Sequence, residues 1–415
     1  MAEMKSLTLN DKTYDGFVDP VARAMGMINS ASGESITVSD SNGTQLFGLR
    51  IFGKTTQDGT PTPDAPVDLV SAGDSGNVST EVCGKNLLNI KSATVDGFTI
   101  TNNGGNIIIN GTNKNSYVMR LKLCSVQVCA GMMYCLNGGL SSDNALIVSK
   151  TIDTFDIQSE GTFGNYTATE DTTMGVYLRI KAGQTLNNYI ICPQLEIGSV
   201  ATEYEPYKSQ TLTISTPNGL PGIPVASGGN YTDANGQQWI CDEIDFWRGV
   251  RVQRVYRKKF TNADGMKRVE SGFGYRFAYA TPPLVQSDKT NGVRSLCDSL
   301  PLAWYGGTYS TPNCYTVNGV EIMIALAGNE TLDELADYFA DKPIEVQGVF
   351  VEPIETPLTE EELAAYAALY TYKGNTTVSN DAGAWMDLEY VMDAKKYIDS
   401  LVASGGGTII PATVE

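Results

Sequence analysis

Between residues 83 and 207 the chain alternates apolar and polar residues in short runs, and turn residues separate one run from the next. Runs such as GFTITNNGGNIIINGT, YVMRLKLCSVQVCAG, ALIVSKTIDTF and TMGVYLRIKAG predict strands, and no helical period lies between them. Strands with one apolar face need a second sheet to cover that face. The segment therefore predicts a jelly-roll-type β-sandwich of antiparallel strands.

The regions that flank this segment predict further strands in separate units. Residues 35–53 alternate around Asn42-Gly43, which predicts a hairpin, and the turn Asn235-Gly236 predicts a second one. Closely spaced prolines at 61, 63 and 66 predict a stiff connection. We therefore predict a mainly β, multi-domain chain, divided into residues 1–34, 35–82, 83–208 (the sandwich), 209–250 (linker and hairpin) and 251–415.

Two helices are expected in the last of these units. Thr331 precedes the amphipathic run LDELADYFAD. Thr359 and Glu362 form a capping box, which opens a helix that we expect to continue to Gly374. The strand-like run IEVQGVFV lies between the two helices. Residues 251–415 therefore predict a smaller α+β domain.

A short helix is also predicted near the amino terminus. Asp19 suits an N-cap, and Pro20 suits the first helical position. Val21, Met25 and Ile28 follow at helical spacing and form one apolar stripe. So short a helix needs a partner surface. The stripe either packs on the chain's own downstream domain or serves oligomerisation and attachment to a larger particle.

Composition excludes several classes of chemistry. The chain has no histidine, so serine and cysteine triads that use a histidine base are excluded. The eight cysteines are scattered without a CxxC pair, which favours buried thiols over a zinc site. A net charge of −18 disfavours nucleic acid and anionic membranes as partners. We expect no metal, no cofactor, no membrane insertion and no signal peptide.

One basic run and one acidic run stand out. Arg248, Arg251, Arg254, Arg257, Lys258 and Lys259 form a concentrated basic stretch. It could bind phosphate-bearing wall polymers, but a solvated strand face or pairing with carboxylates of a neighbouring subunit is the favoured interpretation. Asp242, Glu243 and Asp245 lie close together and leave open a polysaccharide depolymerase with two carboxylates, although nothing in the sequence marks a cleft.

Three stretches together resemble structural proteins of phages and prophages of Gram-positive gut bacteria, of the tail, baseplate or head-fibre kind. They are LTLNDKTYDGFVDPVAR with LFGLRIFGKTTQDGTPTPDAPVDLVSAG, the region from GKNLLNI to ICPQLEIGSVATEYEPY, and LTEEELAAYAALYTYKGNTTVSNDAGAWMDLEYV. The middle region is similar to carbohydrate-binding modules, whose closing strand is like QLEIGSVATEYEPY. Collagen-like repeats and long heptads, which are frequent in phage fibres, are absent.

The resemblance implies a non-enzymatic virion subunit, made in the host cytoplasm, that presents a carbohydrate-binding-like domain for attachment to host-surface glycans. A purely architectural role, as a capsid decoration or baseplate adaptor, is the alternative. The expected partners are other virion proteins and two further copies of the chain in a homotrimer. Aromatic side chains are the candidate sugar contacts because sugar rings stack on them. They are Trp304, Tyr305, Tyr309 and Tyr315 in a loop-like stretch, and Tyr166 and Tyr177 in the sandwich.

Overall fold

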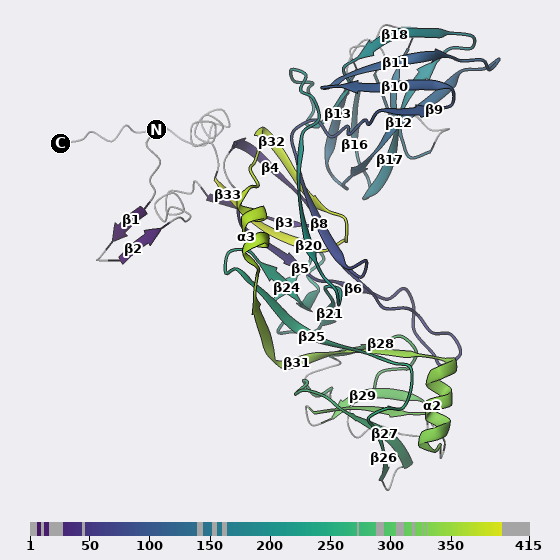
Figure 1. Ribbon diagram of the computed structural model, residues 1–415, viewed down its shortest axis with the longest axis vertical. Coiled ribbons are helices and arrows are strands. Elements are labelled where there is room, and N and C mark those ends of the chain that lie inside the picture. The colour runs from purple at the N-terminus through teal and green to yellow at the C-terminus, as the bar shows by residue number, and fades with distance from the viewer. Residues whose placement is uncertain are drawn as a thin grey trace.

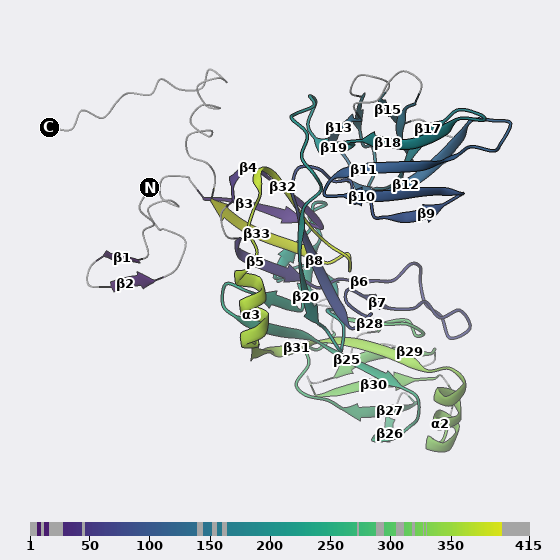
Figure 2. The same ribbon diagram turned by 45° about the horizontal axis from the view of Figure 1, so that its top comes forward.

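The computed structural model confirms a mainly β chain arranged in several parts (Figure 1). It describes residues 6–9, 12–15, 28–43, 46–138, 144–151, 156–159, 164–271, 274–287, 294–303, 311–317, 320–326, 328 and 330–391. A central body carries a sandwich-like domain at one end and a second lobe at the other. Figure 2 shows the same arrangement, with the sandwich strands gathered at one end and helix α2 (Leu332–Asp341) at the opposite end.

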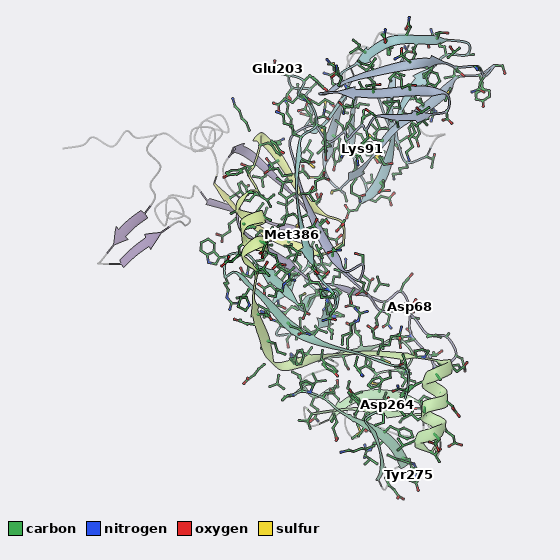
Figure 3. All side chains as sticks on the ribbon, viewed as in Figure 1. Asp68, Lys91, Glu203, Asp264, Tyr275 and Met386 are labelled. Atoms are coloured by element: carbon green, nitrogen blue, oxygen red, sulfur yellow. The ribbon has the colours of Figure 1, made fainter. Side chains whose placement is uncertain are left out.

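The central body is built from two sheets that enclose one apolar core. The first sheet has the order β28 (Ser295–Cys297), β31 (Ile344–Pro357), β25 (Val250–Phe260), β24 (Glu243–Asp245), β5 (Phe47–Phe52), β33 (Trp385–Val391) and β3 (Ile28–Gly33). The second has the order β20 (Ser209–Ser215), β8 (Asn77–Cys83), β32 (Lys373–Asn380) and β4 (Ser35–Asn42). Met386 is fully buried between them and lies in the middle of the molecule (Figure 3).

Helix α3 (Glu360–Ala367) adds to the core of the body. The predicted capping box of Thr359 and Glu362 is present. Tyr366 stacks on Phe246 with ring centroids 4.4 Å apart, and its hydroxyl accepts a hydrogen bond from the Leu49 amide. The helix ends well before Gly374, where we expected it to stop. After the helix, the carbonyl of Leu369 accepts a hydrogen bond from the Leu46 amide, which lies far back in the sequence. β32 then begins at Lys373, so Gly374 lies in a strand.

The sandwich-like domain is inserted into the body between β8 and β20. It contains β9 (Ala93–Val95), β10 (Phe98–Asn103), β11 (Asn106–Thr112), β12 (Met119–Val128), β13 (Met133–Asn137), β14 (Leu146–Ser149), β15 (Ile157–Ser159), β16 (Gly164–Thr167), β17 (Thr172–Ile180), β18 (Thr185–Ile191) and β19 (Gln194–Ile197). Its sheets β18-β11-β10-β9, β12-β17-β14-β15 and β16-β13-β19 share one core of their own. The predicted strands of this segment are confirmed, while jelly-roll connectivity stays a prediction.

Two neighbouring strands connect the inserted domain to the body. β8 and β20 pair up to Cys83 and Ser209, and the Gly84 amide then donates to the Lys208 carbonyl at 3.0 Å. We call residues 83–84 and 208–209 the neck. Because both ends of the insertion leave the body side by side, the domain can fold around its own core without interrupting the sheets of the body.

The second lobe is inserted between β25 and β31, which run on from the body as paired strands. Its core includes Phe260, Phe277 and Phe339, and the predicted helix is confirmed as α2, with Thr331 as its N-cap. The lobe contains β26 (Met266–Ser271), β27 (Gly274–Ala280), β29 (Asn313–Val317), β30 (Glu321–Ala325) and α2. Tyr275 marks the end of this lobe farthest from the sandwich (Figure 3).

Three short groupings complete the described strands. β21 (Gly222–Val225), β23 (Gln238–Cys241) and β22 (Tyr231–Thr232) form a small sheet, in which Pro224 lies on an edge strand as expected for proline. The predicted hairpin around Asn235-Gly236 is confirmed as the β22–β23 pair. β1 (Ser6–Leu9) pairs with β2 (Lys12–Asp15), and β6 (Thr55–Thr56) pairs with β7 (Val70–Ser71).

The predicted hairpin around Asn42-Gly43 is wrong. β4 pairs with β32, whereas β5 pairs with β24 and β33 in the other sheet. Ile36 and Val38 of β4 and Leu49 and Ile51 of β5 nevertheless bury their side chains in the same core. The chain therefore crosses from one layer of the body to the other, and an alternating pattern cannot distinguish such a crossover from a hairpin.

The predicted segments 1–34, 35–82, 209–250 and 251–415 are not separate units. β3, β5, β24 and β33 come from all four segments and share one sheet. Each of these strands forms backbone hydrogen bonds with a strand that is remote in sequence. Composition and local pattern do not reveal which remote strand will be the partner.

The predicted amino-terminal helix lies mainly outside the described residues, which do not include Val21 and Met25. Ile28, the third residue of its apolar stripe, is described and is not helical. It begins β3 and pairs with Val391 of β33. The prediction that Ile28 belongs to a helical attachment stripe is therefore corrected: its backbone completes the edge of the seven-stranded sheet.

Candidate ligand-binding cleft

The predicted sugar contacts that the structure describes, Tyr166, Tyr177 and Tyr315, do not form a recognition surface. Trp304, Tyr305 and Tyr309 lie outside the described residues. Tyr315 is fully buried and its hydroxyl bonds to the Arg276 guanidinium. Tyr177 is buried in β17, a strand covered on both faces. Tyr166 is partly buried against the core of the sandwich. For Tyr315 and Tyr177 the prediction is corrected, because both side chains are buried inside their own lobes, Tyr177 on the central strand β17 and Tyr315 on the edge strand of its sheet.

A cleft of about 800 Å³ lies between the inserted domain and the body. The body contributes the β3–β4 turn, the β22–β23 hairpin and the chain around the β32–β33 turn. The inserted domain contributes Gln127, Cys129 and Asp171 from one end of its sheet. Its volume is in the range of pockets that hold small organic ligands. The cleft is our candidate functional site.

Aromatic rings form one wall of the cleft. Tyr231 stacks on Trp385 with centroids 4.8 Å apart and an interplanar angle of 20°. Trp239 meets Trp385 edge-on, also at 4.8 Å. Phe52 packs behind Tyr231 at 5.0 Å. Tyr231 and Trp385 are buried, whereas Trp239 is only half-buried, so its indole is the ring that can offer a surface to a ligand.

The orientation of Trp239 is fixed by Asp233 on the same hairpin. Oδ2 of Asp233 accepts the indole N–H at 3.1 Å. Oδ1 accepts the amides of Asn235 and Gln237, which closes the turn in which Gly236 adopts a φ of +82°. Partial burial raises the pKa of Asp233, but these hydrogen bonds lower it further, and the net direction is down. Asp233 therefore stays ionised and holds the indole in place.

Lys54 occupies the cleft beside the buried rings. Its Nζ lies 4.9 Å from the ring centroid of Trp385 and 2.7 Å from Oε1 of Glu34. The ammonium is therefore held by a cation–π contact and an ion pair. Trp385 is covered by Lys54, which again leaves Trp239 as the accessible ring.

Trp239, Trp385 and Asp233 were not among the site residues predicted from the sequence. The Asn235-Gly236 turn between Tyr231 and Trp239 was predicted, but its hairpin was placed in the segment 209–250, which was expected to link two domains. Trp385 lies far along the chain from this hairpin and reaches it only because β33 pairs with β5. A tryptophan three residues after the Asn235-Gly236 turn was the one local signal for the site.

The acidic run forms part of a second hollow, of about 440 Å³, but its carboxylates are engaged in structure. Oδ1 of Asp242 accepts the amides of Arg254 and Val255 at 2.7 and 2.8 Å, where β25 bulges against β31. Glu243 pairs with Arg254 at 2.8 Å, and Asp245 accepts the Arg248 amide at 3.0 Å.

Burial raises the pKa of Asp242 to about 7, although the Arg254 and Val255 amides and the charge of Arg254 oppose this shift. A perturbed carboxyl in a hollow can mark catalysis, but structural networks perturb pKa values too. The two amides at the bulge give Asp242 a structural explanation.

The basic run pairs with carboxylates of the same chain. Arg248 pairs with Glu355 at 2.6 Å, and Arg251 pairs with Glu362. Arg257 contacts Asp74 and pairs with Glu345 at 2.6 Å. Lys258 lies over Tyr279, 5.1 Å from the ring centroid. The predicted pairing with carboxylates of a neighbouring subunit is therefore corrected for these arginines, because their carboxylate partners lie in the same chain. Arg251 and Arg257 join β25 to neighbouring elements, and Arg248 joins the turn before β25 to β31.

The described residues form neither a metal-ion cluster nor a helix that could span a membrane. Among the described residues, no group of three or more histidine, cysteine, aspartate or glutamate side chains could hold a metal ion. In the same part of the chain, no helix has the length and apolar character needed to cross a bilayer.

Comparisons with known proteins add no family. No protein-family model matches the chain, and no curated protein matches it. A solved structure described as "Structure of infectious bursal disease virus Gx strain" aligns over 91% of this chain and 88% of that chain, at 9% identity and a TM-score of 0.09. A TM-score this low carries no argument about fold or function.

Proposed function

We propose that this chain is a non-enzymatic surface subunit of a phage particle that attaches to host-surface saccharides through the cleft between its inserted domain and its body. The observation that carries the proposal is the half-exposed indole of Trp239, which Asp233 holds in a cleft lined by polar groups. Placement in a virion rests on the sequence resemblance, as does the proposed homotrimer.

The chemistry of the cleft supports a saccharide ligand. A pyranose ring presents an apolar face that stacks on a flat indole, while its hydroxyls need acceptors and donors around the ring. The cleft offers Trp239 for the first requirement, and Asp171, Asn380 and Asp381 line it as candidates for the second. An oriented ring also loses little conformational freedom when a ligand binds.

A Trp239→Ala variant tests this proposal. We expect purified wild-type chain to bind glycans of the host surface on a glycan array, and the variant to lose at least about tenfold in affinity, equivalent to ~1.4 kcal/mol. Trp247→Ala is the matched control, because Trp247 is 41% exposed and does not line the cleft. Wild-type chain that binds no glycan, or equal loss in both variants, would contradict the proposal.

An architectural role has one observation in its favour. Residues 351–357 of β31 are exposed, and Val351 and Ile354 are 54% and 47% exposed. β28 pairs only with residues 346–348 of that strand, and within the described residues no strand pairs with the same edge beyond Val351. An open edge of this kind suits docking to another virion protein. Val351→Lys should then weaken assembly into particles while glycan binding is retained.

A further inference from the structure

The charged side chains that line the cleft are acidic with one exception. Glu34, Asp171, Asp233 and Asp381 line it together with Lys54. Lys54 is already engaged, because Glu34 pairs with it at 2.7 Å and Trp385 lies under its ammonium. A ligand therefore meets a surface of excess negative charge, on a chain whose net charge is −18.

Two of the four carboxylates, Asp171 and Asp381, keep an oxygen for a ligand and have no basic partner among the described residues, and each comes from a different part of the chain that lines the cleft. On the inserted domain, Oδ1 of Asp171 accepts the Ala130 amide at 2.7 Å. On the body, Oδ1 of Asp381 accepts the Ser79 amide at 2.8 Å. Among the described residues, no hydrogen bond or ion pair engages Oδ2 of either side chain. By contrast, Asp233 uses both oxygens within its own hairpin.

We infer that the cleft selects saccharides that carry an ammonium group and disfavours anionic ones, with Asp171 and Asp381 as the residues that determine this preference. The inference deepens the proposed function and rests on it. An amino sugar stacked on Trp239 carries hydrogen-bond donors around its ring, and its positive charge is attracted by carboxylates that have no basic partner. Phosphate or uronate groups meet the same carboxylates and are repelled.

The test uses the full chain and three oligosaccharide probes: glucosamine hexamer (cationic), N-acetylglucosamine hexamer (neutral) and galacturonic acid hexamer (anionic). Isothermal titration at low salt should give the highest affinity for the cationic probe, at least about threefold above the neutral one, and the lowest for the anionic probe. The advantage should shrink at high salt because these carboxylates are exposed to solvent.

Amide variants of the two carboxylates test whether they cause the preference for the cationic probe. Asp171→Asn with Asp381→Asn should remove most of the cationic advantage, yet leave affinity for the neutral probe within about twofold, since an amide keeps an oxygen acceptor at each position. Asp68→Asn is the matched control. Asp68 is exposed, does not line the cleft and lies at the junction of the body and the second lobe (Figure 3).

The outcomes separate the two proposals. If the neutral probe binds through Trp239 but the cationic probe has no advantage, the charge inference is overturned and the proposed function stands. A preference that survives in the double variant also overturns the inference. If none of the three probes binds, the saccharide function fails and the inference fails with it.

Discussion

The inserted domain and the central body are both antiparallel β-structures, yet they are assembled from the chain in different ways. Every strand of the inserted domain lies between residues 93 and 197, and its core is made from the one continuous segment 87–197. The body joins strands as remote as β3 and β33, whose pairing matches Ile28 with Val391. The comparison teaches that a local pattern predicts a domain well only where one continuous segment supplies the whole core.

The largest expected effect tests whether the two cores are independent. Leu178 is fully buried in the inserted domain and Met386 is fully buried in the body. Leu178→Ala and Met386→Ala should each cost about 2–5 kcal/mol of unfolding free energy, because each leaves a cavity in a packed core. In calorimetry we expect two unfolding transitions, and each variant should lower the midpoint temperature of one of them. A single transition that both variants shift equally would show that the neck couples the cores.

The next effect compares two ion pairs of the body. Glu243 and Arg254 keep side-chain exposures of only 6% and 18%, whereas Glu355 and Arg248 are 47% and 45% exposed. Glu243→Gln should therefore cost about 2–3 kcal/mol, since it leaves a largely buried guanidinium without its counter-charge. Glu355→Gln should cost at most about 1 kcal/mol. Urea denaturation of the chain, followed through the unfolding of the body, measures the loss of unfolding free energy in each variant. Equal losses in the two variants would contradict the ranking by burial.

Particular residues show how far the sequence could predict this molecule. The strands of the inserted domain, the helix after Thr331, the capping box at Thr359 and the Asn235-Gly236 turn depend on neighbouring residues, and all were predicted. The crossover between β4 and β5 was not, because alternation records which residues are buried and not which strand lies alongside.

The candidate site, too, could be predicted only where its residues are neighbours in the sequence. Trp239 and Asp233 lie on one hairpin, but the cleft also needs Asp171 from the inserted domain and Asp381 from the β32–β33 turn. Only the fold brings these distant residues together. The predicted aromatic residues that the structure describes, Tyr166, Tyr177 and Tyr315, instead pack within their own lobes. Composition can supply candidate residue types for a site, but strand order selects among them.

The last effect is a change of stability with pH and concerns Asp242, which binds two amides at the bulge in β25. Burial raises its pKa from 3.8 to about 7, so the folded chain holds an extra proton between about pH 4 and pH 7. The stability that this carboxyl contributes is therefore full below about pH 4, falls as the pH rises to about 7 and then stays constant. Asp242→Asn keeps an oxygen for the amides and cannot titrate.

The stability of the Asn variant relative to wild type should therefore increase from pH 4 to pH 7 and remain level above that. Urea denaturation of both proteins at several pH values measures this difference, from which the other carboxyls cancel. Asp242→Ala is the control: it loses the acceptor and should cost about 1–3 kcal/mol, because two buried amides are left without a partner. A difference between wild type and the Asn variant that does not change with pH would mean that Asp242 keeps its ordinary pKa. The bulge would then hold a carboxylate stabilised by its amides and by Arg254, and the body would tolerate a buried charge at the junction where β24 and β25 meet.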